Sequence, residues 1–190
     1  DVYRPIPILP PDQYLSIYLQ ATEGCSYNKC TFCGLYRDRS FRVKTVAEFR
    51  DHVADVVDFF GAALSSRRSI FLGDGNALVA PPDRVKHWLE TIGATFRLVP
   101  PELTGIERKE YVERHPGTME GVYAFLDAFH TARKSVSDYG EFRELGLHRV
   151  YLGIETGSED LSRFINKPGT PADALAAVHL LHRSGLAVGV

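Results

Sequence analysis

Short apolar segments of this chain alternate with longer amphipathic ones. Five segments rich in β-branched and aromatic residues are predicted strands, at residues 14–20, 69–73, 122–129, 148–155 and 186–190. Segments with apolar residues at helical spacing separate them. Because strands that alternate with amphipathic helices pack as parallel units, the sequence predicts an α/β fold with a parallel sheet. Such a sheet is either open and doubly wound or curved into a barrel.

Capping residues mark the ends of several helices. Thr45 and Glu48 form a capping box at the start of a helix predicted over residues 45–64. A second helix is predicted over residues 83–96, where Trp88 belongs to the core. Further helices are predicted over residues 136–145, from residue 158, and from residue 170 to just before Gly185.

Composition along the chain predicts three regions. Four prolines make residues 1–13 an extended lead-in, and residues 14–190 form one core domain. Residues 97–120 are polar, contain prolines and glycines and lack a clear period, which predicts an insertion of loop and short helix. The apolar segment that ends at Val190 has no turn or polar tail after it. The sequence therefore predicts a domain that is incomplete at its C-terminus.

Charge and cysteine content narrow the class of protein. The chain has 22 basic and 24 acidic residues, so its net charge of −2 gives no support for nucleic-acid binding. No apolar run of the sequence approaches the length of a membrane span. A disulfide between two of the three cysteines would leave the third thiol without a partner. A reducing, cytoplasmic setting is therefore expected.

All three cysteines lie within Gly24–Gly34, directly after the first predicted strand. Cys25, Cys30 and Cys33 have the spacing C-x4-C-x2-C. Thiolates bind zinc or iron–sulfur clusters, but a structural zinc site takes four ligands. The next histidine, His52, lies 19 residues beyond the last cysteine on a predicted helix. Three thiolates on a four-iron cluster would leave one iron open to an exchangeable ligand.

Two further polar motifs follow predicted strands. Gly73, Asp74 and Gly75 come after the second strand, and Glu155 ends the fourth. Because the carboxyl ends of parallel strands meet at one edge, we expect both motifs beside the cysteine loop. Glycine permits close backbone approach to a ligand, and an unpaired carboxylate is costly in a core. The alternatives are a plain turn for the glycine motif and a rim salt bridge for the glutamate.

The cysteine loop resembles that of the radical SAM superfamily, in which three cysteines, usually spaced C-x3-C-x2-C, hold a [4Fe-4S] cluster. An aromatic residue precedes the last cysteine there, as Phe32 does in "CTFC". The resemblance implies that Cys25, Cys30 and Cys33 are cluster ligands and that S-adenosylmethionine chelates the open iron. It also implies reductive cleavage of S-adenosylmethionine to a 5′-deoxyadenosyl radical. The loop here is one residue longer, a variant that the superfamily accommodates.

The resemblance covers residues 14–190 and implies a partial (βα)6 barrel, of which this chain supplies about five units. The cofactor-binding residues that it implies are Phe32, Gly73, Asp74, Gly75 and Glu155. The aromatic ring would lie near the adenine, and the glycine-rich turn would meet the amino group of the methionine moiety. The glutamate would bind the ribose hydroxyls or the amino group.

The resemblance implies partners as well. An external electron donor such as flavodoxin or ferredoxin would reduce the cluster, and the radical would abstract hydrogen from a substrate that the sequence does not identify. Neither a membrane nor nucleic acid is implied. The alternative is a non-catalytic metal-binding module that holds zinc or an electron-transfer iron–sulfur cluster. It accounts for the cysteines but not for the two rim motifs.

Several other polar residues are interpreted from their local context. Asp127, in the third predicted strand, is a candidate for binding substrate or cofactor. His179 and His182 are expected to form a surface pair, because no carboxylate lies nearby in the sequence. Solvated positions are expected for Arg37, Arg39, Arg42, Arg163 and Lys167.

Overall fold

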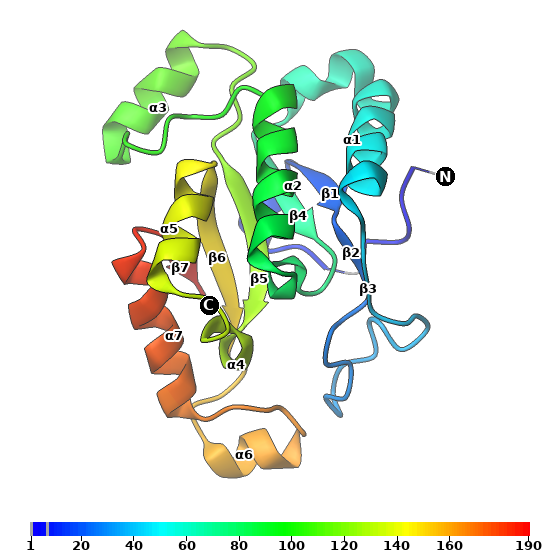
Figure 1. Cartoon of the computed structure of the whole chain (residues 1–190), viewed down its shortest axis with the longest axis vertical. Helices are drawn as coiled ribbons and strands as arrows, with labels where there is room; N and C mark the ends of the chain where they lie inside the picture. Colours follow the sequence, from blue (N-terminus) through cyan, green and yellow to red (C-terminus); the bar gives the residue numbers. More distant parts are fainter. Residues whose placement is uncertain (1, 7) are drawn as a thin grey trace.

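The computed structural model describes residues 2–6 and 8–190. A parallel sheet in the order β1-β4-β5-β6-β7 forms its centre (Figure 1). The strands are β1 (Ser16–Gln20), β4 (Ser69–Gly73), β5 (Val122–Asp127), β6 (Leu147–Gly153) and β7 (Ala187–Gly189). β1 and β7 are the two edges, so the sheet is open. The predicted α/β fold with a parallel sheet of five strands is confirmed as an unclosed barrel.

Helices connect the strands (Figure 1). They are α1 (Val46–Phe60), α2 (Pro82–Thr95), α3 (Gly105–Arg114), α4 (Ala128–Thr131), α5 (Val136–Glu144), α6 (Glu159–Phe164) and α7 (Pro171–Arg183). Of these, α1, α2, α5 and α7 cover one face of the sheet. Alternate strand residues such as Ile17 and Leu72 pack against Phe49 of α1 and Trp88 of α2 in the main core. Trp88 is fully buried, as predicted. The predicted capping box of Thr45 and Glu48 is also present.

The opposite face of the sheet is aromatic. Tyr18, Phe71 and Tyr123 form a second buried cluster, against which Phe125 and Tyr151 pack. Successive residues of a strand point to opposite faces, so one set of side chains faces the helices and the other faces the hollow of the open barrel. The hollow is therefore lined by rings rather than by aliphatic side chains.

The segment before β1 crosses this aromatic face. Pro11–Gln13 form a short 3-10 turn. The carboxylate of Asp12 accepts a hydrogen bond from the Tyr151 hydroxyl at 2.6 Å, and Gln13 accepts one from Ser69 at 2.9 Å. The predicted lead-in therefore bridges β4 and β6. Residues 1 and 7 of that lead-in lie outside the described residues, and the domain boundaries stay predictions.

Strand ends at the rim differ from those predicted. The segment 122–129 ends as a strand at Asp127, because Ala128–Thr131 turn into α4. The sequence also gave no sign of β2 (Thr22–Glu23) and β3 (Arg42–Val43), which pair in antiparallel fashion. Strands of two residues are too short to show a period of two. Their pairing closes the base of the loop that carries the cysteines.

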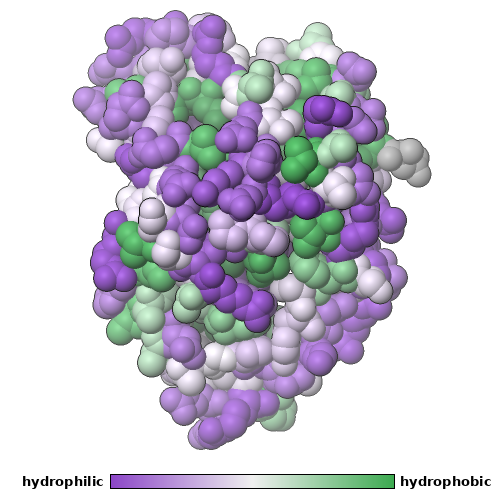
Figure 2. Space-filling view, viewed as in Figure 1, coloured by the Kyte–Doolittle hydropathy of each residue, from purple (hydrophilic) through white to green (hydrophobic). Residues whose placement is uncertain are grey.

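Between α2 and β5 the chain forms loops around α3. Thr104 caps this helix with Glu107, and Leu98 and Met119 form an isolated parallel bridge. Hydrophilic residues dominate the surface over α3 at the upper left of Figure 2. Figure 1 shows that α3 lies near the amino ends of the strands, at the opposite end of the sheet from the cysteine loop.

Among residues 2–6 and 8–190, no helix combines the length and apolarity that crossing a lipid bilayer requires.

Acid is expected to weaken the junction between α1 and β1. His52 is buried, and its Nε2 accepts the backbone N–H of Gln20 at 3.0 Å. Burial, followed by the charge of Lys44, lowers the pKa of His52 from 6.5 to about 4. The unfolded chain therefore takes up this proton first, so the stability is present above pH 6.5 and lost as the pH falls toward 4. We expect the free energy of unfolding in urea to fall by about 2 kcal/mol between pH 7 and pH 5 through this residue.

The matched variant is His52→Gln, which keeps a hydrogen-bond acceptor but does not titrate. We expect its unfolding free energy to depend less steeply on pH than that of the parent chain. His148 keeps its own acid-sensitive contribution in both proteins, because burial lowers its pKa to about 4 as well. Equal pH slopes in the variant and the parent would contradict the assignment to His52.

Candidate functional site

The cysteine loop follows β2 at the carboxyl end of β1 and has no helix or strand between Gly24 and Gly34. Cys25, Cys30 and Cys33 are free thiols of intermediate exposure. In the part of the chain that the structure describes, no three His, Cys, Asp or Glu side chains are grouped closely enough to hold a metal ion. The thiols are therefore neighbours in one loop that metal binding would have to draw together.

Hydrogen bonds brace the backbone of the cysteine loop, and one of them reaches a thiol. The Asn28 amide N–H donates to the Cys25 sulfur at 3.4 Å, and its side chain donates to the Tyr36 carbonyl at 2.7 Å. The exposed Arg37 donates to the carbonyls of Cys33 and Cys30 at 3.0 and 2.9 Å. Burial raises the pKa of both the Cys25 and Cys30 thiols, and Asp127 acts in the same direction. Three soft donors on a braced loop fit the ligand set of an iron–sulfur cluster.

Residues after α6 clasp the far side of the cysteine loop. The Tyr27 hydroxyl donates to the Asn166 carbonyl at 2.8 Å, and the Asn166 side chain donates to the Lys29 carbonyl at 2.9 Å. A backbone bond from Thr31 to Ile165 at 2.9 Å adds to these contacts. Sequence reasoning missed this clasp, because its two sides lie more than 130 residues apart.

Gly73 and Gly75 lie where β4 meets the cysteine loop. A Cβ added at Gly73 would collide with the Tyr18 ring, and one at Gly75 would lie 2.9 Å from the Tyr36 ring. The Gly75 amide also donates to the Gly24 carbonyl at 3.3 Å. Both glycines therefore allow the chain's own tyrosines to pack closely at the rim.

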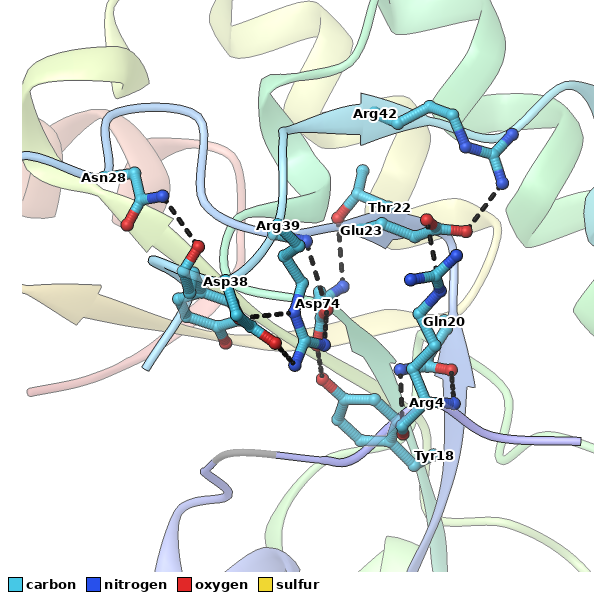
Figure 3. A network of polar contacts seen from close by, with 12 residues as sticks. Arg4, Tyr18, Gln20, Thr22, Glu23, Asn28, Asp38, Arg39, Arg42 and Asp74 are labelled. Carbon is cyan, nitrogen blue, oxygen red and sulfur yellow. Dashed lines mark hydrogen bonds and ion pairs between the residues drawn. The ribbon is translucent and has the colours of Figure 1, made fainter. Parts of the chain in front are cut away.

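Asp74 is fully buried and joins three segments (Figure 3). Its carboxylate accepts the Tyr18 hydroxyl at 2.9 Å and the Gly24 amide at 3.2 Å, while its own amide donates to Thr22 at 2.9 Å. Arg39 approaches the carboxylate at 3.8 Å. Burial raises the pKa of Asp74 in spite of these donors. The predicted site residue thus ties the start of the cysteine loop to β1 and β4.

The prediction that Arg39 is solvated is wrong. Its side chain is only 11% exposed and lies between Asp38 and Asp74. Arg37 and Arg42 are exposed as predicted, and Arg42 pairs with Glu23 and Glu48 at 2.6 Å. Local composition predicts solvent exposure for all three arginines, whereas the fold largely buries the side chain of one of them and exposes the other two.

A second polar network lies at the ends of β5 and β6. The Asn76 side chain donates to Asp127 at 2.6 Å, and His130 lies 3.4 Å from the same carboxylate. Asn76 is fully buried, and its Oδ1 has no hydrogen-bond partner among the described residues. Ser26 of the cysteine loop lies 3.4 Å from the Asn76 amide. Asn76 and His130 were not singled out from the sequence, although Asn76 directly follows the glycine motif.

Glu155 lies just beyond β6 and is paired with Lys167. The Lys167 ammonium lies 2.9 Å from Glu155 and 3.5 Å from Asp127. Its side chain is only 9% exposed, so the prediction of a solvated Lys167 is wrong, whereas Arg163 is exposed as predicted. Burial alone would lower the pKa of Lys167, but the two carboxylates outweigh it and raise the pKa. Glu155 has a φ of 67°, a backbone conformation that favours glycine.

The predicted site residues therefore fall into two networks at one rim. Asp74 joins the start of the cysteine loop, whereas Glu155 joins Asp127 through Lys167. Phe32 projects from the loop between the second and third cysteines and is 56% exposed. His179 and His182 are both exposed on α7, as expected of a surface pair.

Three comparisons place the chain among known proteins. The model of the Radical SAM superfamily matches residues 19–190. Among curated proteins, none matches the chain. Among solved structures, the cobalamin-dependent S-adenosylmethionine radical enzyme OxsB, with aqua-cobalamin and S-adenosylmethionine bound, has a TM-score of 0.59 and 16% identity. The match covers 91% of this chain and 23% of OxsB.

Two other solved structures are similar. The radical S-adenosylmethionine methyltransferase TsrM from Kitasatospora setae, with cobalamin and a [4Fe-4S] cluster bound, has a TM-score of 0.54 and 12% identity over 91% of this chain and 30% of TsrM. HydG, a maturase of the [FeFe]-hydrogenase, has a TM-score of 0.51 and 16% identity over 88% of this chain and 32% of HydG. This chain thus spans about a quarter to a third of each protein. Because the family model covers nearly the whole chain, the chain belongs to the Radical SAM superfamily.

Proposed function

We propose that this chain is the radical-generating core of an enzyme and binds a [4Fe-4S] cluster through Cys25, Cys30 and Cys33. One observation carries the proposal: three free thiols share one braced loop at the carboxyl end of β1 in a chain of this family. Bound there together, the cluster and S-adenosylmethionine would supply the radical chemistry for abstracting hydrogen from a substrate. The residues around the loop bind and orient the two groups.

The polar rim offers complementary partners for S-adenosylmethionine. The unpartnered Oδ1 of buried Asn76 is an acceptor suited to the ammonium of the methionine moiety. Glu155 is a candidate for the ribose hydroxyls, because its side chain is partly exposed and held by Lys167. Phe32 supplies an exposed ring for the adenine. We assign Asp74 a positioning role, since its carboxylate already accepts two hydrogen bonds within the fold.

The proposed enzyme requires partners that supply electrons and substrate. We propose an external one-electron donor such as flavodoxin or ferredoxin, because reductive cleavage of S-adenosylmethionine consumes an electron. The three free thiols of intermediate exposure fit a reducing, cytoplasmic setting. The substrate is a compound with a hydrogen atom that such a radical can abstract.

Anaerobic reconstitution with iron and sulfide tests the proposal. We expect about four irons per chain, an absorbance shoulder at the blue end of the visible range, and an electron paramagnetic resonance signal after reduction. Added S-adenosylmethionine is expected to change that signal, because it would occupy the open iron. Prolonged reduction is expected to release 5′-deoxyadenosine, measured by chromatography.

A zinc titration on the same preparation provides the control. One tightly held zinc per chain, together with no uptake of a cluster, would favour the non-catalytic metal-binding module and reject the enzyme. If added S-adenosylmethionine does not change the electron paramagnetic resonance signal of the cluster, the enzyme is also rejected, in favour of an electron-transfer role. The proposal therefore requires that the parent chain both takes up the cluster and responds to S-adenosylmethionine.

A further inference from the structure

A cavity of about 820 Å³ lies between α3 and the amino ends of β5 and β6. The last four residues of β6, after Arg149, separate it by roughly 13 Å along the strand from the rim that carries the cysteine loop. Tyr123 and Arg149 line it from the strands, and Arg108 lines it from α3. Its volume is within the range of small-molecule sites, and none of the proposed cluster or cofactor residues borders it.

The lining of this cavity carries more positive than negative charge. Arg68, Arg108, Lys109 and Arg149 supply four cations. The acids of the lining are Glu113 and Glu120, and His148 also borders the cavity. Burial, and then the charges of Arg108, Arg149 and Arg143, lowers the pKa of His148 to about 4, so this imidazole is neutral at pH 7. Because Asp12 pairs with Arg149 at 3.1 Å and offsets its charge, an excess of about one positive charge faces the cavity.

Among the residues that the structure describes, Arg108 has no carboxylate partner and is held by carbonyl groups. Its guanidinium donates to the carbonyls of Pro100 and Leu103 at 3.4 and 3.2 Å and also to the carbonyl of Glu120. Neutral carbonyls fix the orientation of a guanidinium without cancelling its charge. Burial lowers the pKa of Arg108, as expected for a cation that is not paired within the fold.

Two buried polar atoms at the cavity have no partner in the described part of the chain. Thr118 is 3% exposed, and its Oγ1 makes no hydrogen bond. The Nε of Arg149 is likewise buried and without a partner, while its Nη1 pairs with Asp12 at 3.1 Å. Buried polar atoms are rarely left unsatisfied in native proteins. A hydroxyl and a guanidinium N–H at one cavity are two donors that an oxyanion can satisfy.

We propose that this cavity binds a small organic anion through its carboxylate or phosphate group. On binding, the side chains of Thr118 and Arg149 turn these two buried donors toward the oxyanion, and Arg108 and Lys109 balance its charge. The apolar part of the ligand lies against Val99, Val112 and Ala187, which also line the cavity. The site differs from the proposed cofactor site in position, charge and ligand class.

Isothermal titration of the full chain with phenyl phosphate and with benzoate tests this site, and the two probes distinguish a phosphate from a carboxylate ligand. Benzylamine is the cationic control of similar size. We expect at least one anion to bind and the amine not to bind. Arg149→Gln is expected to raise the Kd by about tenfold through loss of a charged donor. Arg114→Gln is the matched control, because Arg114 lies on α3, is exposed and pairs with Glu110 away from the cavity.

Thr118→Val separates binding from folding. Valine has nearly the same shape and removes an unsatisfied hydroxyl, so the thermal stability without ligand is expected to be equal or higher. The Kd of the anion is nevertheless expected to rise. Lys109→Gln serves as a second charge variant, because Lys109 is exposed and its loss does not disturb the core.

Several results would overturn the proposal. They are no heat change with either anion, equal affinity for benzylamine, or equal Kd values for Arg149→Gln, Lys109→Gln and Arg114→Gln. An unchanged Kd in Thr118→Val would show that the Thr118 hydroxyl does not bind the anion. The titrations are repeated with and without the reconstituted cluster. Anion binding that is the same in both preparations keeps this inference independent of the proposed function.

Discussion

Replacing Asp74 with alanine is expected to lower the free energy of unfolding by roughly 3 kcal/mol. The substitution leaves the buried Tyr18 hydroxyl and the Gly24 amide without their acceptor, and it leaves Arg39 beside an empty space. Burial makes each unsatisfied group costly. Because Gly24 precedes Cys25, the start of the cysteine loop is released as well. Urea denaturation under anaerobic conditions measures the first effect, and iron content after reconstitution measures the second.

Asp38→Ala is the matched control for this prediction. Asp38 pairs with the same arginine at 2.9 Å, but its side chain is 66% exposed. Exposed ion pairs contribute little, so we expect a change within about 0.5 kcal/mol and unchanged iron content. Asp74→Asn keeps one acceptor oxygen and should lie between the two variants. If Asp74→Ala is as stable as Asp38→Ala, the buried network does not hold the loop.

The order of strands and helices was predictable because each element carries its own periodic pattern. The capped helix after Thr45 and the buried Trp88 follow from spacing within a single segment. The common rim also follows from local patterns, since parallel strands must end on the same edge. The sequence alone therefore predicts that Glu155 and the cysteine loop lie at one end of the sheet.

Burial of polar residues was not predictable, because it depends on contacts between distant segments. Arg39 and Lys167 sit in polar stretches that are typical of solvated surface. Each is buried by a carboxylate far along the chain, Asp74 in one case and Asp127 in the other. Local composition contains no information about either partner, so both residues are wrongly predicted to be solvated.

The two glycines of the glycine motif lie at the predicted place, but packing within the fold also explains why they are glycines. Gly73 and Gly75 lie at the rim where the sequence placed them, yet their missing Cβ atoms make room for Tyr18 and Tyr36. Packing within the fold and approach of a cofactor require the same residue type. The Oδ1 of Asn76, the next residue, has no hydrogen-bond partner among the described residues, which a plain turn does not explain. This oxygen was visible only once the burial of its side chain was known.

Replacing Cys30 with alanine is expected to abolish retention of the cluster while leaving the fold intact. The thiol is of intermediate exposure, and the carbonyl that accepts from Arg37 at 2.9 Å belongs to the backbone, which alanine preserves. We therefore expect the free energy of unfolding without metal to change by less than about 0.5 kcal/mol. Iron content after anaerobic reconstitution is expected to fall from about four per chain to near zero, because two thiolates do not hold a four-iron cluster.

Thr31→Ala is the control, since Thr31 is exposed and adjacent to Cys30, and its bond to Ile165 comes from the backbone amide, which alanine keeps. It is expected to retain a full cluster with an unchanged response to S-adenosylmethionine. A Cys30→Ala protein with full iron content and the parent's signal would refute the ligand assignment. The two measurements answer different questions: iron retention reports the three thiolates, whereas the response to S-adenosylmethionine reports the open iron. Only a chain that loses the first in Cys30→Ala and shows the second in the parent uses its three cysteines as a radical SAM site.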